Sequence, residues 1–384
     1  MSGPLPGLPG ALAVGHRLPL APIARLAHTP RFAVALLIAL SGGSLFAWLH
    51  SPLPWLIGPL IVCGLANIFG AQLQSPVLSR NVGQWVIGTA LGLYFTAETL
   101  QRLATLLWPL LGGLLFAYLL GGAYGWALRR FVGMDPATAF FAGAVGGASE
   151  MAIQGERNGA SVETIAAAHT LRVMIVVIFI PFLYQWLGLH GSDGYVPGRV
   201  QVVPQGLALL VAATCAAALV MRRIRSPNAW LIGPLLATAA MTATGVVPSA
   251  LPGWVISAGQ VLIGVSLGVR FAPGFFSRAP RLCVVVTVFT FIAIGLSAAF
   301  GSALGWVAGI PAATMILATA PGGVAEMSLT AKILQLGVPV VSTFQLVRLL
   351  AMVLTAGSIY RLLARRFGWP MGDLPVHPRE DEDD

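Results

Sequence analysis

The residues best suited to chemistry occur twice in this chain, as a Gly-Gly-x-x-Glu element followed later by an arginine. The first copy is Gly146-Gly147-Ala148-Ser149-Glu150 with Arg172, and the second is Pro321-Gly322-Gly323-Val324-Ala325-Glu326 with Arg348. Two consecutive glycines break a helix, and the half-helix that follows presents a positive N-terminal end that can hold an anion or a carboxylate. Each element is therefore a candidate binding or gating site. The alternative is a tight turn that lets helices pack closely.

Four charged residues of this set lie in apolar sequence, where lipid would exclude an isolated charge. Glu150 and Glu326 can bind a cation, carry a proton or pair with an arginine. Arg172 and Arg348 fall well inside the last apolar segment of each half, so each needs a partner. Two roles are open for the arginines: a structural brace with Glu150 or Glu326, and contact with an anionic substrate.

Further polar and small residues recur inside the apolar segments. Gln84 and Gln260 are duplicated, and each suits either a hydrogen bond between helices or the lining of a cavity. A Gly-x-x-x-Gly spacing follows each glutamine, which predicts close helix packing. The glycines concerned are Gly88, Gly92, Gly264 and Gly268.

The sequence shows no pattern of metal or cofactor ligands. The three cysteines, Cys63, Cys215 and Cys283, share no ligand spacing and fall in apolar runs, so we interpret them as small core residues. The histidines form no pairs either, and His169 has Gln345 as its counterpart in the second half, an asymmetry with a bearing on coupling. We expect no metal, no cofactor and no enzymatic activity.

The elements that must position these residues belong to a membrane protein. Of the 384 residues, 57% are hydrophobic and 9% are charged, whereas soluble domains carry about 25% charged residues. Too little polar surface is available to cover a globule in water. This composition excludes a soluble enzyme, a nucleic-acid-binding protein and a disordered protein.

The chain is an internal duplication. Ser51–Leu60 returns as Ser226–Leu235 at an offset of 175 residues, and from Gly83 to Arg172 the matching residues return at an offset of 176. One register held over such a length does not arise by chance. We expect a cytosolic arm over 1–30, membrane repeats over 31–190 and 200–366, and an acidic cytosolic tail over 367–384.

Each repeat contains six apolar segments, and the fifth (136–154 and 312–330) is short and interrupted by glycines and a glutamate. If the fifth segment enters the membrane and returns, nearly all arginine clusters fall on the cytoplasmic side together with the N-terminus. The pattern predicts an all-α polytopic protein with about ten transmembrane helices plus two re-entrant Gly-Gly hairpins. Five crossings per repeat would insert the second repeat upside down, an arrangement found in many secondary transporters.

Three motifs carry a resemblance to a known family. They are the duplicated Trp-Leu-Ile-Gly-Pro-Leu of 55–60 and 230–235, the Gly-Gln helix with its Gly-x-x-x-Gly spacing, and Ala320–Met327. Together they resemble the AbrB family of bacterial membrane proteins, over nearly the whole chain beyond the N-terminal arm. The first copy departs from the Pro-Gly-Gly form because Val145 stands where the second copy has Pro321.

The family is labelled both as a regulator of AidB expression and as an ammonia monooxygenase. A monooxygenase needs a cluster of metal ligands, and a direct gene regulator needs a soluble DNA-reading domain; the sequence offers neither. We therefore expect a secondary transporter or permease of a small solute in the bacterial inner membrane, with both termini cytoplasmic; an anionic solute is one of the alternatives left open. A membrane sensor that affects gene expression indirectly is the second hypothesis, and a membrane enzyme the third. The expected partners are the lipid bilayer and a small molecule or ion, without nucleic acid; a homo-oligomer is left open.

Overall fold

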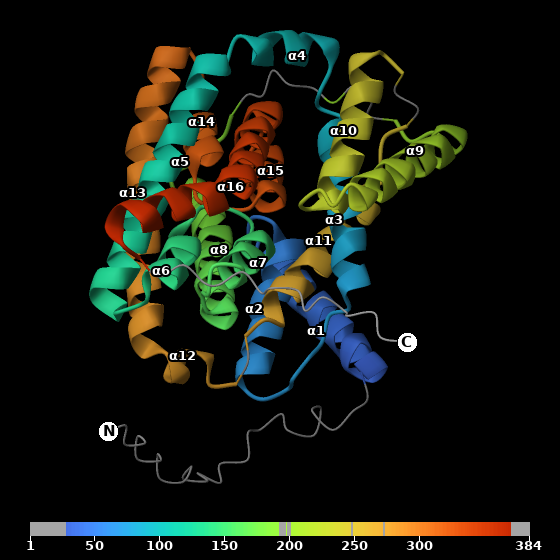
Figure 1. Ribbon diagram of the computed structural model, residues 1–384. Coiled ribbons are helices and arrows are strands. Elements are labelled where there is room, and N and C mark those ends of the chain that lie inside the picture. Colours follow the sequence, from blue (N-terminus) through green and yellow to red (C-terminus); the bar gives the residue numbers. More distant parts are fainter. Residues whose placement is uncertain (1–27, 192–196, 198–200, 247–248, 272, 370–384) are drawn as a thin grey trace, which may run out of the picture.

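The computed structural model describes residues 28–191, 197, 201–246, 249–271 and 273–369. Within these ranges every regular element is helical, which confirms the all-α class (Figure 1). Most of the expected N-terminal arm (1–27) and of the acidic tail (370–384) lies outside the described residues.

The helices follow the duplication. The first repeat contains α1 (His28–Trp48), α2 (Pro54–Ile68), α3 (Val77–Gly92), α4 (Ala97–Ala104), α5 (Leu107–Ala127) with a π-helical turn η2 (Leu128–Val132), α6 (Pro136–Gly143), α7 (Ala148–Glu156) and α8 (Val162–Trp186). The second contains α9 (Pro204–Arg223), α10 (Ala229–Ala243), α11 (Gly253–Gly268), α12 (Phe275–Arg278), α13 (Pro280–Ala308), α14 (Ala312–Thr319), α15 (Val324–Ile333) and α16 (Val338–Phe367). Helices α2, α3, α6, α7 and α8 begin 175 or 176 residues before their counterparts, so the duplicated sequence folds into duplicated elements.

The expected number of spanning helices is met only in part. Six helices of the described chain are long and apolar enough to cross a membrane, namely those over 30–48, 107–132, 162–186, 204–223, 280–308 and 338–367. Helices α2, α3, α10 and α11 have 15 or 16 residues. At 1.5 Å per residue such a helix is about 23 Å long, which is shorter than the hydrocarbon layer of about 30 Å. Sequence hydropathy alone did not reveal this shortness.

The contacts divide the described helices into two bundles. One bundle consists of α1, α2 and α3 with α9, α10 and α11, and the other of α5 to α8 with α13 to α16. Within the first bundle the repeats interlock, because α3 packs on α10 and α11 packs on α2. Each repeat therefore contributes half of both bundles, and neither repeat is a separate domain.

The Gly-x-x-x-Gly spacing makes this interlocking possible, which confirms the packing role predicted for it. A Cβ atom at Gly88 would clash with the carbonyl oxygen of Leu231, and one at Gly264 with the carbonyl oxygen of Leu56. Leu231 and Leu56 are themselves counterparts in the two repeats. Backbone approaches this close are available only to glycine, which has no Cβ atom.

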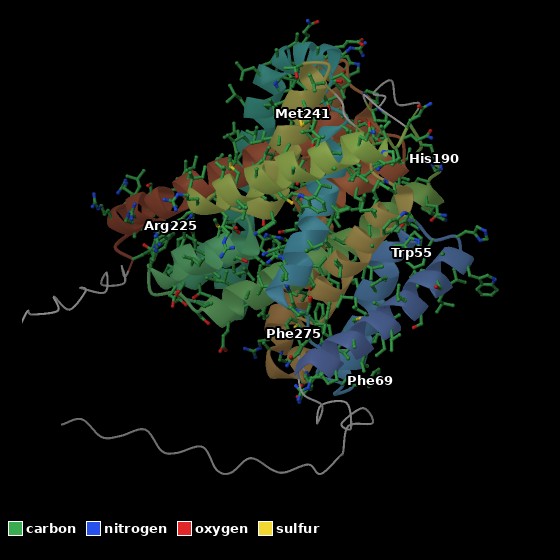
Figure 2. All side chains as sticks on the ribbon, turned by 90° about the vertical axis from the view of Figure 1, so that its right-hand side faces the viewer. Trp55, Phe69, His190, Arg225, Met241 and Phe275 are labelled. Carbon is green, nitrogen blue, oxygen red and sulfur yellow. The ribbon has the colours of Figure 1, made fainter. Side chains whose placement is uncertain are left out.

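Several counterpart elements lie toward opposite ends of the view. Figure 1 shows α4 at the upper end and α12 at the lower end, and α14 above α6. Figure 2 shows Phe69, just after α2, near the lower end, whereas Met241, near the end of α10, lies toward the upper end. These counterpart elements therefore lie toward opposite ends of the view.

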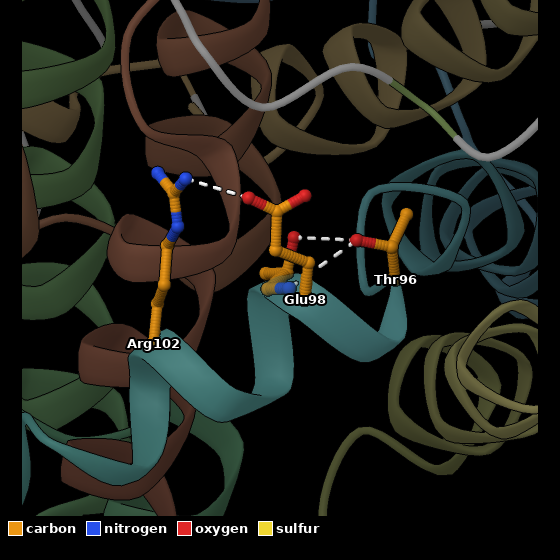
Figure 3. A network of polar contacts seen from close by, with 4 residues as sticks. Thr96, Glu98 and Arg102 are labelled. Carbon is orange, nitrogen blue, oxygen red and sulfur yellow. Dashed lines mark hydrogen bonds and ion pairs between the residues drawn. The ribbon is translucent and has the colours of Figure 1, made fainter.

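The short helix α4 carries an exposed arginine whose partner lies on the same helix. In the short helix α4, Thr96 caps the N-terminus by accepting a hydrogen bond from the backbone N–H of Thr99. One turn on, Arg102 forms an ion pair of 2.6 Å with Glu98 (Figure 3). Both side chains are largely exposed, so the pair contributes little to stability, but it offsets the charge of Arg102 locally.

Candidate functional site

The fifth segment of each repeat is a broken helix, as the glycines predict. In the first repeat α6 ends at Gly143 and α7 begins at Ala148; in the second, α14 ends at Thr319 and α15 begins at Val324. Gly147 and Gly323 occupy the N-cap positions in extended conformations. The backbone between the half-helices therefore has peptide groups that no helical hydrogen bond satisfies.

Each glutamate folds back onto the start of its own half-helix. Glu150 and Glu326 are the third residues of α7 and α15, and an oxygen of each carboxylate occupies the space that a Cβ atom on Gly147 or Gly323 would need. A glutamate at this helix position can reach the N-cap backbone N–H, as in a capping box. The positive end of each half-helix is thus already occupied by the protein's own carboxylate, and only glycine leaves room for it.

Arg172 of α8 holds the other side of the first break. Its guanidinium group donates hydrogen bonds to the carbonyl oxygens of Gly143 (3.3 Å) and Ala144 (3.0 Å), where α6 ends. The side chain is buried, at 2% exposure. A cation at the C-terminal end of a helix is favoured by the helix dipole as well as by these bonds.

Arg348 of α16 does the same at the second break. It donates to the carbonyl oxygens of Ala320 (2.6 Å) and Gly322 (2.5 Å), just beyond the end of α14. Neither Arg172 nor Arg348 forms an ion pair with Glu150 or Glu326; among the described residues the ion pair found is Arg102–Glu98. The brace between arginine and glutamate, one of the two roles left open from the sequence, is therefore wrong. The carbonyls freed by the helix break take the place of the carboxylate partner.

His169 and Gln345 complete this arrangement in equivalent ways. The ring nitrogens of His169 lie 2.9 Å from Arg172 and 2.9 Å from the carbonyl oxygen of Phe141. Gln345 accepts from Arg348 (2.6 Å) and donates to the carbonyl of Leu317 (3.0 Å), the counterpart of Phe141. With its Nε2 protonated and its Nδ1 accepting, histidine matches the amide group for group. The chemical asymmetry seen in the sequence is therefore not an asymmetry of role.

The two breaks meet at one cavity of about 90 Å³ between the two bundles. It is lined by most of the sequence-predicted residues, which are Gln84, Gly146, Gly147, Glu150, Arg172, Pro321, Gly322, Gly323 and Glu326. Three predicted residues are not among its lining residues. Arg348 lines a separate small hollow beside α5, Gln260 is buried within α11, and Ser149 faces a neighbouring vestibule.

Four lining residues of the cavity did not emerge from the sequence. Arg80 of α3, Ser266 of α11 and Arg270 just after α11 lie on its wall, together with Asn228, the N-cap of α10. Asn228 has a positive φ of 46° and lies 3.4 Å from the Gln84 side-chain nitrogen. None of the four has the same residue at the equivalent position of the other repeat, so a search for repeats passes over them.

A vestibule of about 650 Å³ adjoins the cavity. It lies between α7 and α8 on one side and the α12–α13 region on the other, and it shares Ala148 and Arg270 with the cavity wall. At the equivalent positions of the other repeat, Val324 stands for Ala148 and Leu346 for Thr170 of the vestibule wall. These larger apolar residues pack in the main hydrophobic core. The region of the second repeat that corresponds to the vestibule is therefore filled by side chains.

Metal-ligand groups do not gather anywhere in the described part of the chain: no three His, Cys, Asp or Glu side chains lie close enough together to hold an ion. The arrangement is instead one of fixed helix ends, two carboxylates and several guanidinium groups around a small polar space. Such a space can hold and orient a small solute.

Comparison with known proteins gives a consistent family. A family model described as "Transition state regulatory protein AbrB" matches residues 55–364. A protein of Bacillus subtilis (strain 168) named "Uncharacterized protein YhjN" is 28% identical over 361 residues, covering 86% of this chain and 92% of the relative. A protein of Escherichia coli (strain K12) named "Putative regulator AbrB" is 26% identical over 324 residues, covering 83% and 92%.

Proposed function

This chain belongs to the AbrB family, and we propose that it is a secondary transporter that moves a small solute through the cavity between its two broken helices. The observation that carries the proposal is that both breaks, one from each repeat, end at the same cavity on the boundary between two bundles. Interrupted helices that meet between repeats form the substrate sites of many transporters. Non-helical backbone at membrane depth is tolerated where it lines such a cavity.

The proposal includes inverted repeats in a bacterial inner membrane, with both termini in the cytoplasm. The positions of counterpart elements toward opposite ends in Figure 1 support the inversion. Arginines near helix ends, such as Arg222 and Arg223 at the end of α9, support the orientation because short cytoplasmic segments are rich in Arg. On this arrangement one hairpin enters from each side of the membrane.

The position of the vestibule indicates from which side the cavity is accessible in this conformation. It opens next to the first hairpin, whereas the equivalent region of the second repeat is filled by residues such as Val324 and Leu346. We take this as a conformation with access from one side. Movement of one bundle against the other, along the boundary where α3 meets α15, would give access from the opposite side.

A membrane sensor is the second candidate, and two observations favour it. The matching family description and the name of the Escherichia coli relative both speak of regulation. A hollow that opens toward one side also suits a receptor, which binds its ligand without passing it on. We propose no enzymatic activity for either candidate.

Solute flux into liposomes that contain the purified full-length protein tests transport. The probes are formate, acetate, nitrate, ammonium and methylammonium, because the cavity of about 90 Å³ has room for only a few groups the size of water. We expect saturable flux of at least one probe, lost in Glu326→Gln and kept in Arg281→Gln, whose side chain is exposed away from the cavity. Flux that survives in Glu326→Gln would contradict this site, and binding of a probe without flux would favour the sensor.

A further inference from the structure

The charges of the cavity divide into those with partners and those without. Arg172 is bound to carbonyl oxygens and to His169, and the two glutamates fold onto the starts of their half-helices. Arg80 and Arg270 also line the cavity, but no hydrogen bond or ion pair joins either guanidinium group to another described residue. They are the cationic groups left for a ligand.

Arg80 and Arg270 are close enough for their charges to interact. Their charges act on each other, and both act on the Glu326 carboxylate, although neither is within ion-pair distance of it. Both side chains are half-buried, and two like charges held together at a partly desolvated wall are costly unless an anion lies between them. The guanidinium fork is suited to a carboxylate or another planar oxyanion, which it binds through two parallel hydrogen bonds.

The repeat symmetry shows that the fold does not require this pair. The residues that build the breaks recur at an offset of 176, including both Gly-Gly pairs, both glutamates and the two carbonyl-binding arginines. Arg80 and Arg270 do not recur, because Ile256 and Tyr94 occupy the equivalent positions. The other repeat builds the same helices without a charge at these positions, so the fold does not need the two arginines. Ligand binding explains such charges in a membrane protein better than a structural role does.

We propose that Arg80 and Arg270 bind the anionic group of the transported solute, and that this solute is a small carboxylate or oxyanion of the size of formate or acetate. The inference rests on the proposed function and adds the substrate class. The cavity volume of about 90 Å³ sets the size, and Ser266 and Asn228 offer further hydrogen bonds on the same wall. Because Arg270 also lines the vestibule, an entering anion meets it first.

Binding to the purified full-length protein in detergent tests the proposal. Acetate, formate, nitrate and ammonium are titrated by calorimetry and by thermal unfolding. Gluconate, which is too large for the cavity, supplies the other anion of the solutions. We expect saturable binding of acetate or formate, and an affinity lower by about tenfold or more in Arg80→Gln and in Arg270→Gln. Arg80→Lys and Arg270→Lys keep the charge and should recover part of the affinity.

Two further variants separate binding from structure. Arg281→Gln removes an exposed arginine outside the cavity and should leave the affinity unchanged. Gly122→Ala adds a Cβ atom that meets nothing within 4 Å, at a position of α5 outside the cavity, and should also leave the affinity unchanged. Weaker acetate binding in either control would contradict the proposal, because a general disturbance of the protein would then account for the arginine variants.

The outcomes also distinguish this inference from the proposed function. Binding of ammonium with no response to acetate, formate or nitrate overturns the anion site, and flux of ammonium would then leave transport standing. Unchanged acetate affinity in both glutamine variants also overturns it. Acetate binding that depends on Arg80 and Arg270 without flux supports the anion site and overturns transport.

Discussion

At the scale of single residues, the broken helices provide their own counter-charges. Each break leaves a negative helix end, which an arginine binds, and a positive helix start, which a glutamate occupies. Arg172 with Glu150 and Arg348 with Glu326 are thus neutralised in place without touching one another. Hydrogen bonds to a charged group contribute about 1.5–3 kcal/mol each, which is enough to hold non-helical backbone in a fixed shape.

The equivalence of His169 and Gln345 leads to a prediction. His169→Gln should keep the hydrogen bonds to Arg172 and to the Phe141 carbonyl, because Gln345 makes the matching pair in the second repeat. We expect thermal stability and flux close to those of the parent protein. His169→Leu has a similar volume but cannot accept from Arg172, so it should destabilise the protein by about 1–3 kcal/mol. Equal losses in both variants, measured by thermal unfolding in detergent, would mean that the imidazole has a role of its own.

The sequence identified most residues of the breaks but not their partners. Glycine pairs, glutamates and arginines stand out because they are unusual in an apolar segment. Their recurrence at the same offset in the second repeat shows that their presence is not due to chance. Their partners are backbone carbonyls such as that of Ala144 and Ala320, which have no signature in the sequence. Arg80 and Arg270 were not identified from the sequence because each occurs in one repeat only and has no counterpart in the other.

At the scale of elements, the half-helices depend on the glycine that precedes each of them. Gly323→Ala would place a Cβ atom where the Glu326 carboxylate lies, and Gly147→Ala would do the same to Glu150. We expect each variant to displace its glutamate and to reduce flux strongly. The cost in stability should be about 1–3 kcal/mol, as for other overpacked sites.

A matched control exists within the same bundle. Gly122 of α5 has no atom within 4 Å of an added Cβ, and the same holds for Gly295, within α13. Alanine at these positions should leave flux and unfolding temperature unchanged or slightly raised, since alanine favours a helix over glycine. If Gly323→Ala behaved like Gly122→Ala, the contact between glycine and carboxylate would have no functional weight.

Element lengths were the weaker part of the sequence prediction. The breaks in the fifth segments were expected within 136–154 and 312–330, and they occur there. The shortness of α2, α3, α10 and α11 was not expected, because apolar residues continue into the turns that end these helices. Hydropathy reports burial or lipid contact and does not report where a helix stops.

At the scale of the whole molecule, the duplication produces two bundles rather than two domains. Helices α3 and α11 each pack against the second helix of the other repeat, so the repeats exchange partners. Repetition in the sequence predicted equal halves, but it could not predict the exchange, which depends on contacts between distant segments. Because of this exchange both bundles contain elements of both repeats, and the cavity between the bundles is lined by residues of both repeats.

Cysteine labelling tests the inverted arrangement. Arg157 follows α7 and Ile333 ends α15 at the equivalent position, and both side chains are exposed. Single cysteines at these two positions, in a background with Cys63, Cys215 and Cys283 replaced, should react with a membrane-impermeant thiol reagent from opposite faces of the membrane. Reaction of both from the same face would contradict the inversion.

Access to the cavity from both sides is the central claim, and one residue allows a direct measurement. Ser266 lies on the cavity wall, and Ser266→Cys is a small change in a buried position. In liposomes with known protein orientation, and with the three native cysteines replaced, a small impermeant thiol reagent is added from one side or the other. A transporter predicts that Cys at this position is modified from either side, and more slowly when acetate occupies the cavity. Modification from one side only, under every condition, would contradict transport and identify the cavity as the ligand site of a receptor.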